Sequence, residues 1–327
     1  MVKTYNYMKK LLTICLSLIL TPLFSQAQWE VMNPSNPAQK RHESTFVECD
    51  GTFYSMGGRG KRPVEAYNLK ENTWKIVADA PIEFNHFQAV SYKHEIYVLG
   101  AFTGNYPHEK PIPNVLIFNP KTNTWREGAK IPENRLRGSA GIFVKGDKIY
   151  MVCGILDGHW DGHVAWFDEF DPKTNEWKVL PDAPRARDHF QAAIKGTKVY
   201  VAGGRRSTAS SGKVLDYTIG EVDSYDFKTQ KWTTFEQNLP TTRAGTASVI
   251  AGNKLIVMNG ESIRQTPAHN EVEAMDLKTG QWSRLPNLIQ GRHGTGVVKY
   301  KNYLYVVSGS ANRGGGPELS EMERLGL

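Results

Sequence analysis

Short apolar runs rich in β-branched and aromatic residues alternate with polar turns along most of the chain. Residues 149–152 (IYMV) and 199–202 (VYVA) are typical runs, and turns such as residues 145–148 (KGDK) separate them. Each run has the length of a strand, and two runs joined by a Gly-, Asn- or Asp-containing turn are typical of a β-hairpin. The pattern predicts an all-β chain built from many short antiparallel strands.

Tryptophan marks an internal repeat with a period near 50 residues. The six repeated tryptophans are 45 to 55 residues apart: Trp29, Trp74, Trp125, Trp177, Trp232 and Trp282. In the last five copies a large apolar residue stands seven positions before the tryptophan, as in residues 118–125 (FNPKTNTW). A β-rich run that ends in glycine precedes each copy, as in residues 200–204 (YVAGG). Each unit therefore predicts four strands, and we expect the apolar columns to form the core.

The glycine endings and the spacing from tyrosine to tryptophan resemble the kelch family, including the kelch-type propeller of galactose oxidase. The resemblance covers essentially all of residues 28–327 and implies a single six-bladed β-propeller domain. The C-terminal unit lacks its tryptophan strand, whereas residues 29–32 (WEVM) supply one at the other end of the chain. We expect the N-terminal strand to complete the last blade and so to remove a pair of exposed edges.

Residues 1–27 have the layout of a secretory signal peptide. Met8, Lys9 and Lys10 form a basic start, Leu11–Phe24 is a mostly apolar run, and small residues lead up to Ala27. We expect cleavage near Ala27 and a secreted or periplasmic protein. Loss of the three lysines in this segment lowers the formal charge from +7 to +4. That mild charge, without a long basic run, does not indicate nucleic acid, and no later segment predicts a membrane span.

The crossings between blades contain a repeated arginine. Aligned on the glycine that ends each second strand, one column reads Arg41, Phe84, Arg137, Arg187, Arg243 and Arg292. The next two columns contain His42, Asn85, Asp188 and His293, and then Glu43, His86 and His189. Loops between the second and third strands add Arg59, Arg205, Arg206, Glu261, Arg264, His269 and Arg313. Because guanidinium groups bind carboxylate, sulfate or phosphate well, these columns predict a basic ligand-binding mouth around the central channel. Alternatively, an arginine repeated once per blade serves the blade itself.

The third unit contains a distinctive loop, residues 157–166 (DGHWDGHVAW). Trp160 with Asp161 and His159 has the composition of a sugar platform, in which the ring covers an apolar sugar face and polar groups bind hydroxyls. His159 and His163 would instead suit a metal, but two glycines argue against the helix that would align them. We predict no metal and no cofactor. Cys49 and Cys153 fall in non-neighbouring blades, so we expect no disulfide.

The leading functional hypothesis is an exported propeller that binds a carbohydrate, and more specifically an acidic one, at the mouth of the channel. One alternative is a sugar mutarotase, epimerase or other glycan-active enzyme, since the chain resembles a secreted sialic acid mutarotase in blade number and export; His189 beside Asp188, or Glu261, would then transfer protons. Another alternative is an interaction module for an envelope or extracellular protein. The predicted ligand-binding residues are Arg41, His42, His86, Arg137, His159, Trp160, Asp161, Arg187, Asp188, His189, Arg205, Arg243, Glu261, Arg292, His293 and Arg313.

Overall fold

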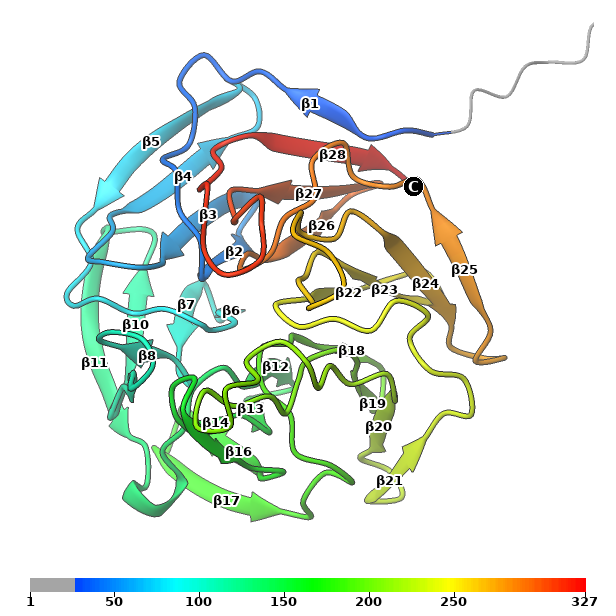
Figure 1. The fold of residues 1–327 in the computed structure, drawn as a ribbon. Helices are drawn as coiled ribbons and strands as arrows, with labels where there is room; N and C mark the ends of the chain where they lie inside the picture. The colour runs from blue at the N-terminus through cyan, green and yellow to red at the C-terminus, as the bar shows by residue number, and fades with distance from the viewer. Residues whose placement is uncertain (1–26) are drawn as a thin grey trace, which may run out of the picture.

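The computed structural model describes residues 27–327, and the predicted signal segment lies outside this range up to residue 26. The described chain forms six four-stranded antiparallel sheets arranged as blades around a central axis, which confirms the predicted propeller (Figure 1). In order from the first blade to the sixth, the strands are β2 (Ser44–Cys49), β3 (Thr52–Gly57), β4 (Val64–Asn68) and β5 (Thr73–Ala78); β6 (Val90–Tyr92), β7 (Glu95–Val98), β10 (Asn114–Asn119) and β11 (Thr124–Lys130); β12 (Gly141–Lys145), β13 (Lys148–Val152), β16 (Phe167–Asp171) and β17 (Glu176–Leu180); β18 (Ala192–Lys195), β19 (Lys198–Val201), β20 (Asp223–Asp226) and β21 (Lys231–Thr234); β22 (Ala247–Ala251), β23 (Lys254–Met258), β24 (Val272–Asp276) and β25 (Trp282–Leu285); and β26 (Val297–Tyr300), β27 (Tyr303–Val307), β28 (Met322–Gly326) and β1 (Glu30–Met32).

Three further short elements lie outside the blades. Two hairpins, β8 (Phe102–Thr103) with β9 (Lys110–Pro111) and β14 (Ile155–Asp157) with β15 (Asp161–His163), lie in the loops of the second and third blades. A 3-10 helix, Glu133–Arg135, precedes the third blade. Among the described residues no helix is long and apolar enough to cross a membrane.

The outer hairpin of each blade is fixed by a polar side chain at the end of its third strand. In the first blade, Asn68 Oδ1 accepts the backbone N–H groups of Lys70 and Glu71 at 2.9 and 3.0 Å. The residues at the same position in the next four blades bond in the same way: Asn119, Asp171, Asp226 and Asp276. This local bonding turns the chain back without help from the rest of the fold, which explains the repeated Asn/Asp-rich turn.

The N-terminal strand closes the ring, as predicted. β1 pairs antiparallel with β28, and Val31 lies opposite Glu323. Trp29 is buried, and its Nε1–H donates to the Pro286 carbonyl of the preceding blade at 2.8 Å. Trp177 and Trp232 make the same bond to the blades before them. These three tryptophans therefore bond neighbouring blades together, whereas Nε1 of Trp74 and of Trp125 is buried without a hydrogen-bond partner. All six tryptophans of the column pack against the core clusters, which confirms its structural role.

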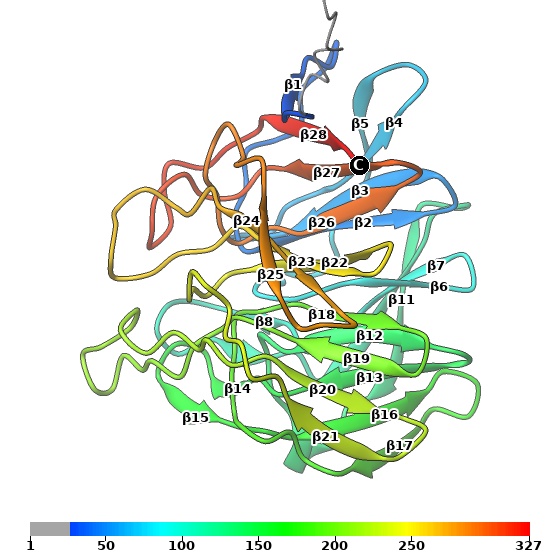
Figure 2. The same ribbon diagram turned by 90° about the vertical axis from the view of Figure 1, so that its right-hand side faces the viewer.

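The two faces of the propeller differ. The crossings between blades and the loops between second and third strands lie on the face that is toward the viewer in Figure 1 and at the left in Figure 2. Single bridges tie crossing to loop within a blade, as in Asp188 with Arg205 and His293 with Ser310. These bridges hold the residues around the channel mouth in fixed register.

Candidate functional site

The arginine column lies inside the blades, so the prediction that it lines the mouth needs correction. All five arginines are fully buried, and each pairs with an acidic residue on the third strand of its own blade. These pairs are Arg41 with Glu65, Arg137 with Asp168, Arg187 with Asp223, Arg243 with Glu273 and Arg292 with Glu323. The same guanidinium groups donate to carbonyl oxygens at the end of the second strand. Their donors are therefore used within the blade, and their side chains do not reach the cavity.

The second blade replaces this ion pair with an apolar pair. Phe84 occupies the arginine position, and Leu116 occupies the acidic position, two residues before Phe118. Both side chains are buried in the same core cluster. The two positions change together, as expected of residues that serve each other rather than a ligand.

The residue two positions after the arginine position lies at the axis in every blade. This axial column is Glu43, His86, Ser139, His189, Gly245 and Gly294, and all six have positive φ. Backbone bonds link it around the channel: the N–H groups of residues 86, 139, 189 and 245 each donate to the preceding axial carbonyl, and Ser44 N–H donates to Gly294. At Gly294 a Cβ would lie 2.7 Å from the backbone nitrogen of Glu43, so glycine is required there.

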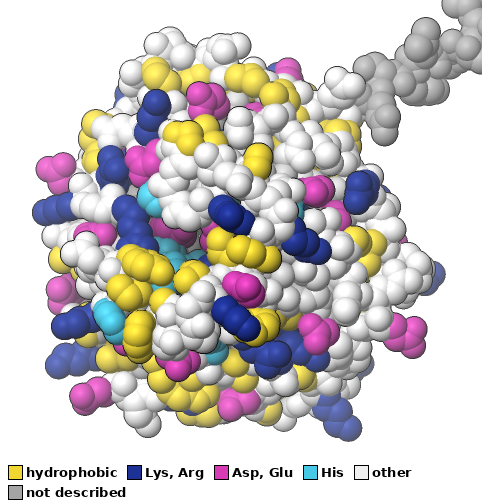
Figure 3. Space-filling model, viewed as in Figure 1, with side chains coloured by type: hydrophobic (Ala, Val, Ile, Leu, Met, Phe, Trp, Pro, Cys, Tyr) yellow, Lys and Arg dark blue, Asp and Glu magenta, His cyan; other side chains and the backbone are white. Residues whose placement is uncertain are grey.

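A cavity of about 650 Å³ opens above this ring. Histidine and acidic side chains are visible within the hollow in Figure 3, with Lys and Arg around it. The space next to the axial column on the other side has a volume of only about 30 Å³, enough for one or two waters. The axial residues therefore form the floor of the larger cavity. The cavity wall is made by His42, Glu43, Arg59, His86, Asn105, Tyr106, His159, Arg205, Val214, Leu215, Glu261, Gly314 and Gly315.

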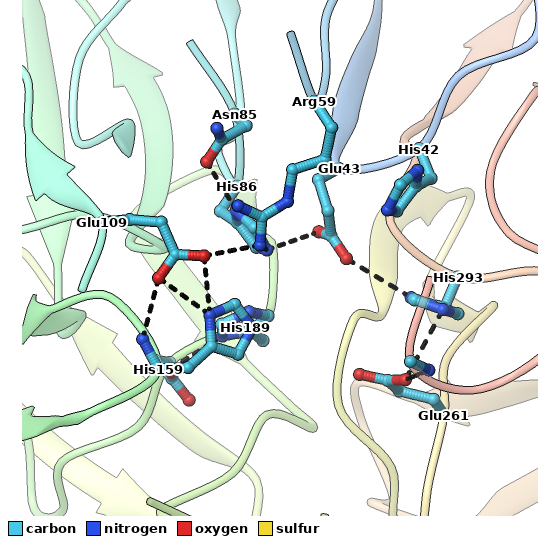
Figure 4. Close-up of polar contacts among 12 residues, drawn as sticks. His42, Glu43, Arg59, Asn85, His86, Glu109, His159, His189, Glu261 and His293 are labelled. Carbon is cyan, nitrogen blue, oxygen red and sulfur yellow. Dashed lines mark hydrogen bonds and ion pairs between the residues drawn. The ribbon is translucent and has the colours of Figure 1, made fainter. Parts of the chain in front are cut away.

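Three imidazoles from three blades meet at the cavity floor. His86 and His189 come from the axial column, and His159 reaches the axis from the loop of the third blade (Figure 4). Each pair of ring centroids is 4.9 Å apart. Each ring has a nitrogen within 4.8 Å of a nitrogen of the other two. Ser139 is the axial residue of the third blade, and its small side chain leaves space for His159.

Each of the three imidazoles is oriented by an oxygen acceptor at Nδ1. His86 Nδ1 is 2.7 Å from Asn85 Oδ1, and His189 Nδ1 is 2.7 Å from Asp188 Oδ2. His159 Nδ1 lies 3.0 Å from Glu109 Oε1, and its backbone N–H donates to the same carboxylate. All three Nδ1 atoms therefore carry their hydrogen and donate, which leaves the Nε2 atoms as acceptors. Nε2 of His86 is 3.5 Å from Arg59 Nη2, and Nε2 of His189 is 3.1 Å from Arg205 Nη2.

A second group lies across the cavity. His293 stands between two carboxylates, with Nδ1 3.6 Å from Glu43 Oε1 and Nε2 3.5 Å from Glu261 Oε2. His42 Nδ1 is 2.8 Å from Glu318 Oε1, and His42 Nε2 faces the cavity beside Gly315. Imidazole–carboxylate pairs thus occur on both sides of the cavity.

The cavity interior is more acidic than the sequence predicted. Burial opposes the ionisation of Glu109, but bonding and charge from His159 and Arg59 lower its pKa to about 2. Burial likewise opposes ionisation of Glu261, while His293 and Arg205 lower its pKa to about 2. The carboxylates of Glu43 and Asp188 also have lowered pKa values, since facing histidines outweigh their burial.

The histidines are affected in the opposite direction. Burial, followed by the charges of His159, His189 and Arg59, lowers the pKa of His86 well below 6.5. Burial also lowers the pKa of His159, although Glu109 partly opposes this effect. These two rings are therefore neutral at pH 7. Four carboxylates, those of Glu43, Glu109, Asp188 and Glu261, and two guanidinium groups, those of Arg59 and Arg205, surround these rings.

Several predicted residues lie away from the cavity wall. Trp160 is 39% exposed and packs on His108, while Asp161 is exposed in the β15 strand. Arg313 lies on the rim, where its Nη1–H donates to the Ile263 carbonyl. Of the loop at residues 157–166, only His159 lines the cavity.

Of the predicted residues, the structure brings His42, His86, His159, Arg205 and Glu261 together in the cavity wall, and Asp188, His189 and His293 contact them from below and beside. Sequence reasoning left out four contributors: Glu43, Arg59, Glu109 and Tyr106. Glu43 and Arg59 stand in the aligned columns, whereas Glu109 and Tyr106 lie in an irregular loop with no counterpart in other blades.

Comparison with known proteins supports the fold independently. A family model described as the KLHDC2/KLHL20/DRC7 Kelch-repeats domain matches residues 89–309, which is more than half of the chain. The solved structure "Structure of YjhT" superposes with a TM-score of 0.74 at 18% identity, covering 88% of this chain and 95% of that one. That likeness concerns the fold alone.

Two curated relatives differ in how much of their length they share. N-acetylneuraminate epimerase of Haemophilus influenzae (strain PittEE) is 29% identical over 318 residues, which are 91% of this chain and 75% of that protein. Kelch-like protein terF of Aspergillus terreus (strain NIH 2624 / FGSC A1156) is 28% identical over 253 residues, which are 75% of this chain and 54% of that protein. The chain thus spans about half the length of the second relative.

Proposed function

The chain belongs to the Kelch-repeat family, and from this premise we propose that its mouth cavity binds a small acidic carbohydrate. The observation that carries the proposal is the cavity itself, in which imidazoles and carboxylates face one another beneath a rim of guanidinium groups. Its volume of about 650 Å³ lies in the range of small-molecule sites. The relationship to an N-acetylneuraminate epimerase over 91% of the chain supports a carboxylated sugar as the ligand class.

Arg59 is the residue that we assign to the sugar carboxylate. Its side chain is 24% exposed in the cavity wall and is held by Glu109 on one side. Tyr106 lines the same wall and is 55% exposed, so its ring is free to cover an apolar sugar face. Glu43 and Glu261 would accept hydrogen bonds from sugar hydroxyls on the opposite side.

The rim would bring an anionic sugar to this wall. Arginine and lysine side chains surround the opening in Figure 3, and positive charge around an opening raises the association rate of an anion, whereas the carboxylates are buried deeper in the cavity. The rim residues are Arg62, Arg206, Lys213, Arg264 and Arg313.

We further propose that the protein interconverts the anomers of its sugar. Ring opening moves one proton from the anomeric hydroxyl to the ring oxygen while the bond between that oxygen and the anomeric carbon breaks; closure on the other face of the carbonyl reverses the transfer. A neutral imidazole accepts the hydroxyl proton and, as imidazolium, returns it to the ring oxygen. We assign this role to His42, whose Nδ1 is held by Glu318 and whose Nε2 faces the cavity.

Binding is tested by titrating the mature chain with N-acetylneuraminate and with a neutral N-acetylated hexose in a calorimeter. We expect the acid alone to bind, and Arg59→Ala to weaken it by about 10- to 100-fold, the value of a hydrogen bond to a charged group. Arg284→Ala is the matched control, because Arg284 is exposed on the outer strand β25 and does not line the cavity. Equal binding of both sugars, or of neither, would overturn the proposal.

Turnover is tested by saturation-transfer NMR between the α and β anomers of N-acetylneuraminate. We expect catalysed exchange that His42→Ala abolishes while sugar affinity remains. Binding without any catalysed exchange would leave a binding protein and refute the enzyme. Export is proposed on the composition of residues 1–27, and sequencing the N-terminus of protein recovered outside the cytoplasm tests it.

A further inference from the structure

We propose that His86, His159 and His189 bind a divalent transition-metal ion, zinc by preference, at the axis of the propeller. The proposal goes beyond carbohydrate binding and does not depend on it. The sequence predicted no metal, because the only spacing that it offered was that of His159 and His163. The structure instead brings His159 together with two histidines from other blades.

The three rings are close enough for one ion. Nitrogens at most 4.8 Å apart would place a central ion about 2.8 Å from each, whereas zinc–nitrogen bonds are about 2.0–2.1 Å long. Closing the triangle therefore requires each ring to move by less than about 1 Å. Two of the rings sit on the bonded axial column, and the third is anchored through Glu109, so the triangle is preformed.

The hydrogen-bonding pattern points the lone pairs to the centre. Asn85 Nδ2 donates to Glu83 Oε1 at 3.0 Å, which fixes Asn85 Oδ1 toward His86. Nδ1 of His86 must then carry the hydrogen, and its Nε2 lone pair faces Glu43 Oε2 at 3.3 Å. The guanidinium of Arg59, whose Nη2 is 3.5 Å from His86 Nε2, is the cation that now lies beside this lone pair and the carboxylate, and it must withdraw when an ion binds.

The other two ligands have the supporting groups that metal-binding histidines use. Carboxylates of Glu109 and Asp188 accept the Nδ1 hydrogens of His159 and His189, respectively. Such carboxylate–histidine pairs fix the tautomer and raise the basicity of the ligating nitrogen.

The local charge also favours a divalent cation. Four carboxylates, those of Glu43, Glu109, Asp188 and Glu261, lie around the three rings together with two guanidinium groups, and these carboxylates would attract a divalent cation. Arg205 Nη2 now lies 3.1 Å from His189 Nε2 and must withdraw when an ion binds. Glu261 Oε1, 3.5 Å from Arg205 Nη1, is placed to receive the displaced guanidinium.

Three imidazole ligands with an open side toward the cavity are the arrangement of catalytic zinc sites. Carboxylate-rich oxygen sites suit magnesium or calcium, whereas imidazole suits zinc, copper, iron and nickel. The open coordination position would face the same cavity that we assign to the sugar.

The test uses the tag-free mature chain, stripped with a chelator and titrated with Zn²⁺ alone against a chromophoric competitor. We expect one ion per chain, and Co²⁺ to give the intense visible spectrum of a tetrahedral nitrogen site. No bound ion at micromolar concentrations, or the weak spectrum of octahedral Co²⁺, would overturn the proposal. This measurement is made on the unaltered chain, so it stands even where a histidine variant does not fold.

Single variants locate the ion. His86→Ala, His159→Ala and His189→Ala should each weaken zinc at least about 100-fold, and Asp188→Asn by about 10- to 100-fold. His42→Ala is the matched control, an imidazole of the same cavity outside the triangle, and should leave zinc affinity unchanged. Equal losses in the control and the three variants, or zinc affinity unchanged in all of them, would refute the assignment. Because no sugar is present, failure of the carbohydrate proposal leaves this result intact.

Discussion

Replacing Arg243 with methionine should destabilise the fold strongly without altering the cavity. The guanidinium makes five hydrogen bonds inside the fifth blade, four to carbonyl oxygens and one to the Glu273 carboxylate at 2.6 Å. Methionine would leave the Glu273 charge buried with only the hydroxyl and N–H of Thr241 as partners. Removing one partner of a buried ion pair costs about 3–5 kcal/mol.

Substitution of the partner, Glu273, measures how much of the loss comes from the ion pair with Arg243. In the double variant Arg243→Met, Glu273→Met no charge remains unpaired, although the carbonyl oxygens lose their donors. We therefore expect the double variant to cost about 2 kcal/mol less than the sum of the two single variants, a coupling typical of contacting residues. The apolar pair of Phe84 and Leu116 shows that a blade tolerates loss of both charges at once.

Urea denaturation followed by tryptophan fluorescence measures the free energy of unfolding, with Arg206→Met as the exposed control. Sugar and zinc affinity of the folded Arg243→Met protein should match the parent. A stability within about 0.5 kcal/mol of the parent, the range of ordinary surface substitutions, would refute the internal role. Normal stability combined with loss of sugar or zinc binding would also refute it, since that result would indicate that the arginine column contacts the ligand.

Three further outcomes follow from particular residues. Burial lowers the pKa of His86 well below 6.5. As the pH is lowered through 6.5, the imidazole is therefore protonated in the unfolded chain before it is protonated in the folded chain, and the free energy of unfolding decreases. His86→Gln should reduce this fall in urea denaturation at pH 7.5 and 5.5, and an unchanged slope would count against it. Gly158→Ala would place a Cβ 2.0 Å from a carboxylate oxygen of the second-blade loop and should cost about 1–3 kcal/mol. Gly212→Ala, at similarly positive φ with nothing within 4 Å, is the control for backbone strain, and equal losses in thermal denaturation would contradict the steric cause. Tyr106→Ala should weaken the calorimetric affinity for the sugar about 3- to 10-fold, which corresponds to the free energy of one ring contact, whereas Trp160→Ala should leave it unchanged. The opposite result would support the prediction that Trp160 stacks on the sugar.

The fold was predictable because the features that define it are local and repeated. A tryptophan, an apolar residue seven positions earlier and a glycine-terminated strand recur in nearly every unit, and an Asn or Asp side chain fixes each outer turn through its own backbone. Closure by β1 followed from counting which strand the last unit lacked. The strand and turn signals each lie within a single stretch of about 50 residues, and only the closure by β1 required an inference across the whole chain.

The arginine column was assigned to the mouth, with a role inside the blade as the stated alternative, because its acidic partner on the third strand was not identified. In each blade that has the arginine, the third strand carries an acidic residue two positions before its repeated apolar residue, as Glu273 does before Met275. In the second blade both positions are apolar, with Phe84 and Leu116. Comparing the two columns along the sequence would have indicated an internal ion pair, because a ligand contact gives no reason for the acidic position to change with the arginine.

The cavity chemistry could not be predicted in the same way, because it depends on where the repeat is broken. The buried pairs and the axial ring of backbone bonds hold the blades in place without using the axial side chains. Apart from position 294, where the close approach of Glu43 requires glycine, these positions are consequently free to differ, and they carry glutamate, histidine, serine and glycine. His159 then enters the space above Ser139 from a loop that no other blade contains, held by Glu109 from a second such loop. A repeated scaffold with unequal axial residues therefore produces one asymmetric centre, and its ligands come from three blades that no sequence spacing connects.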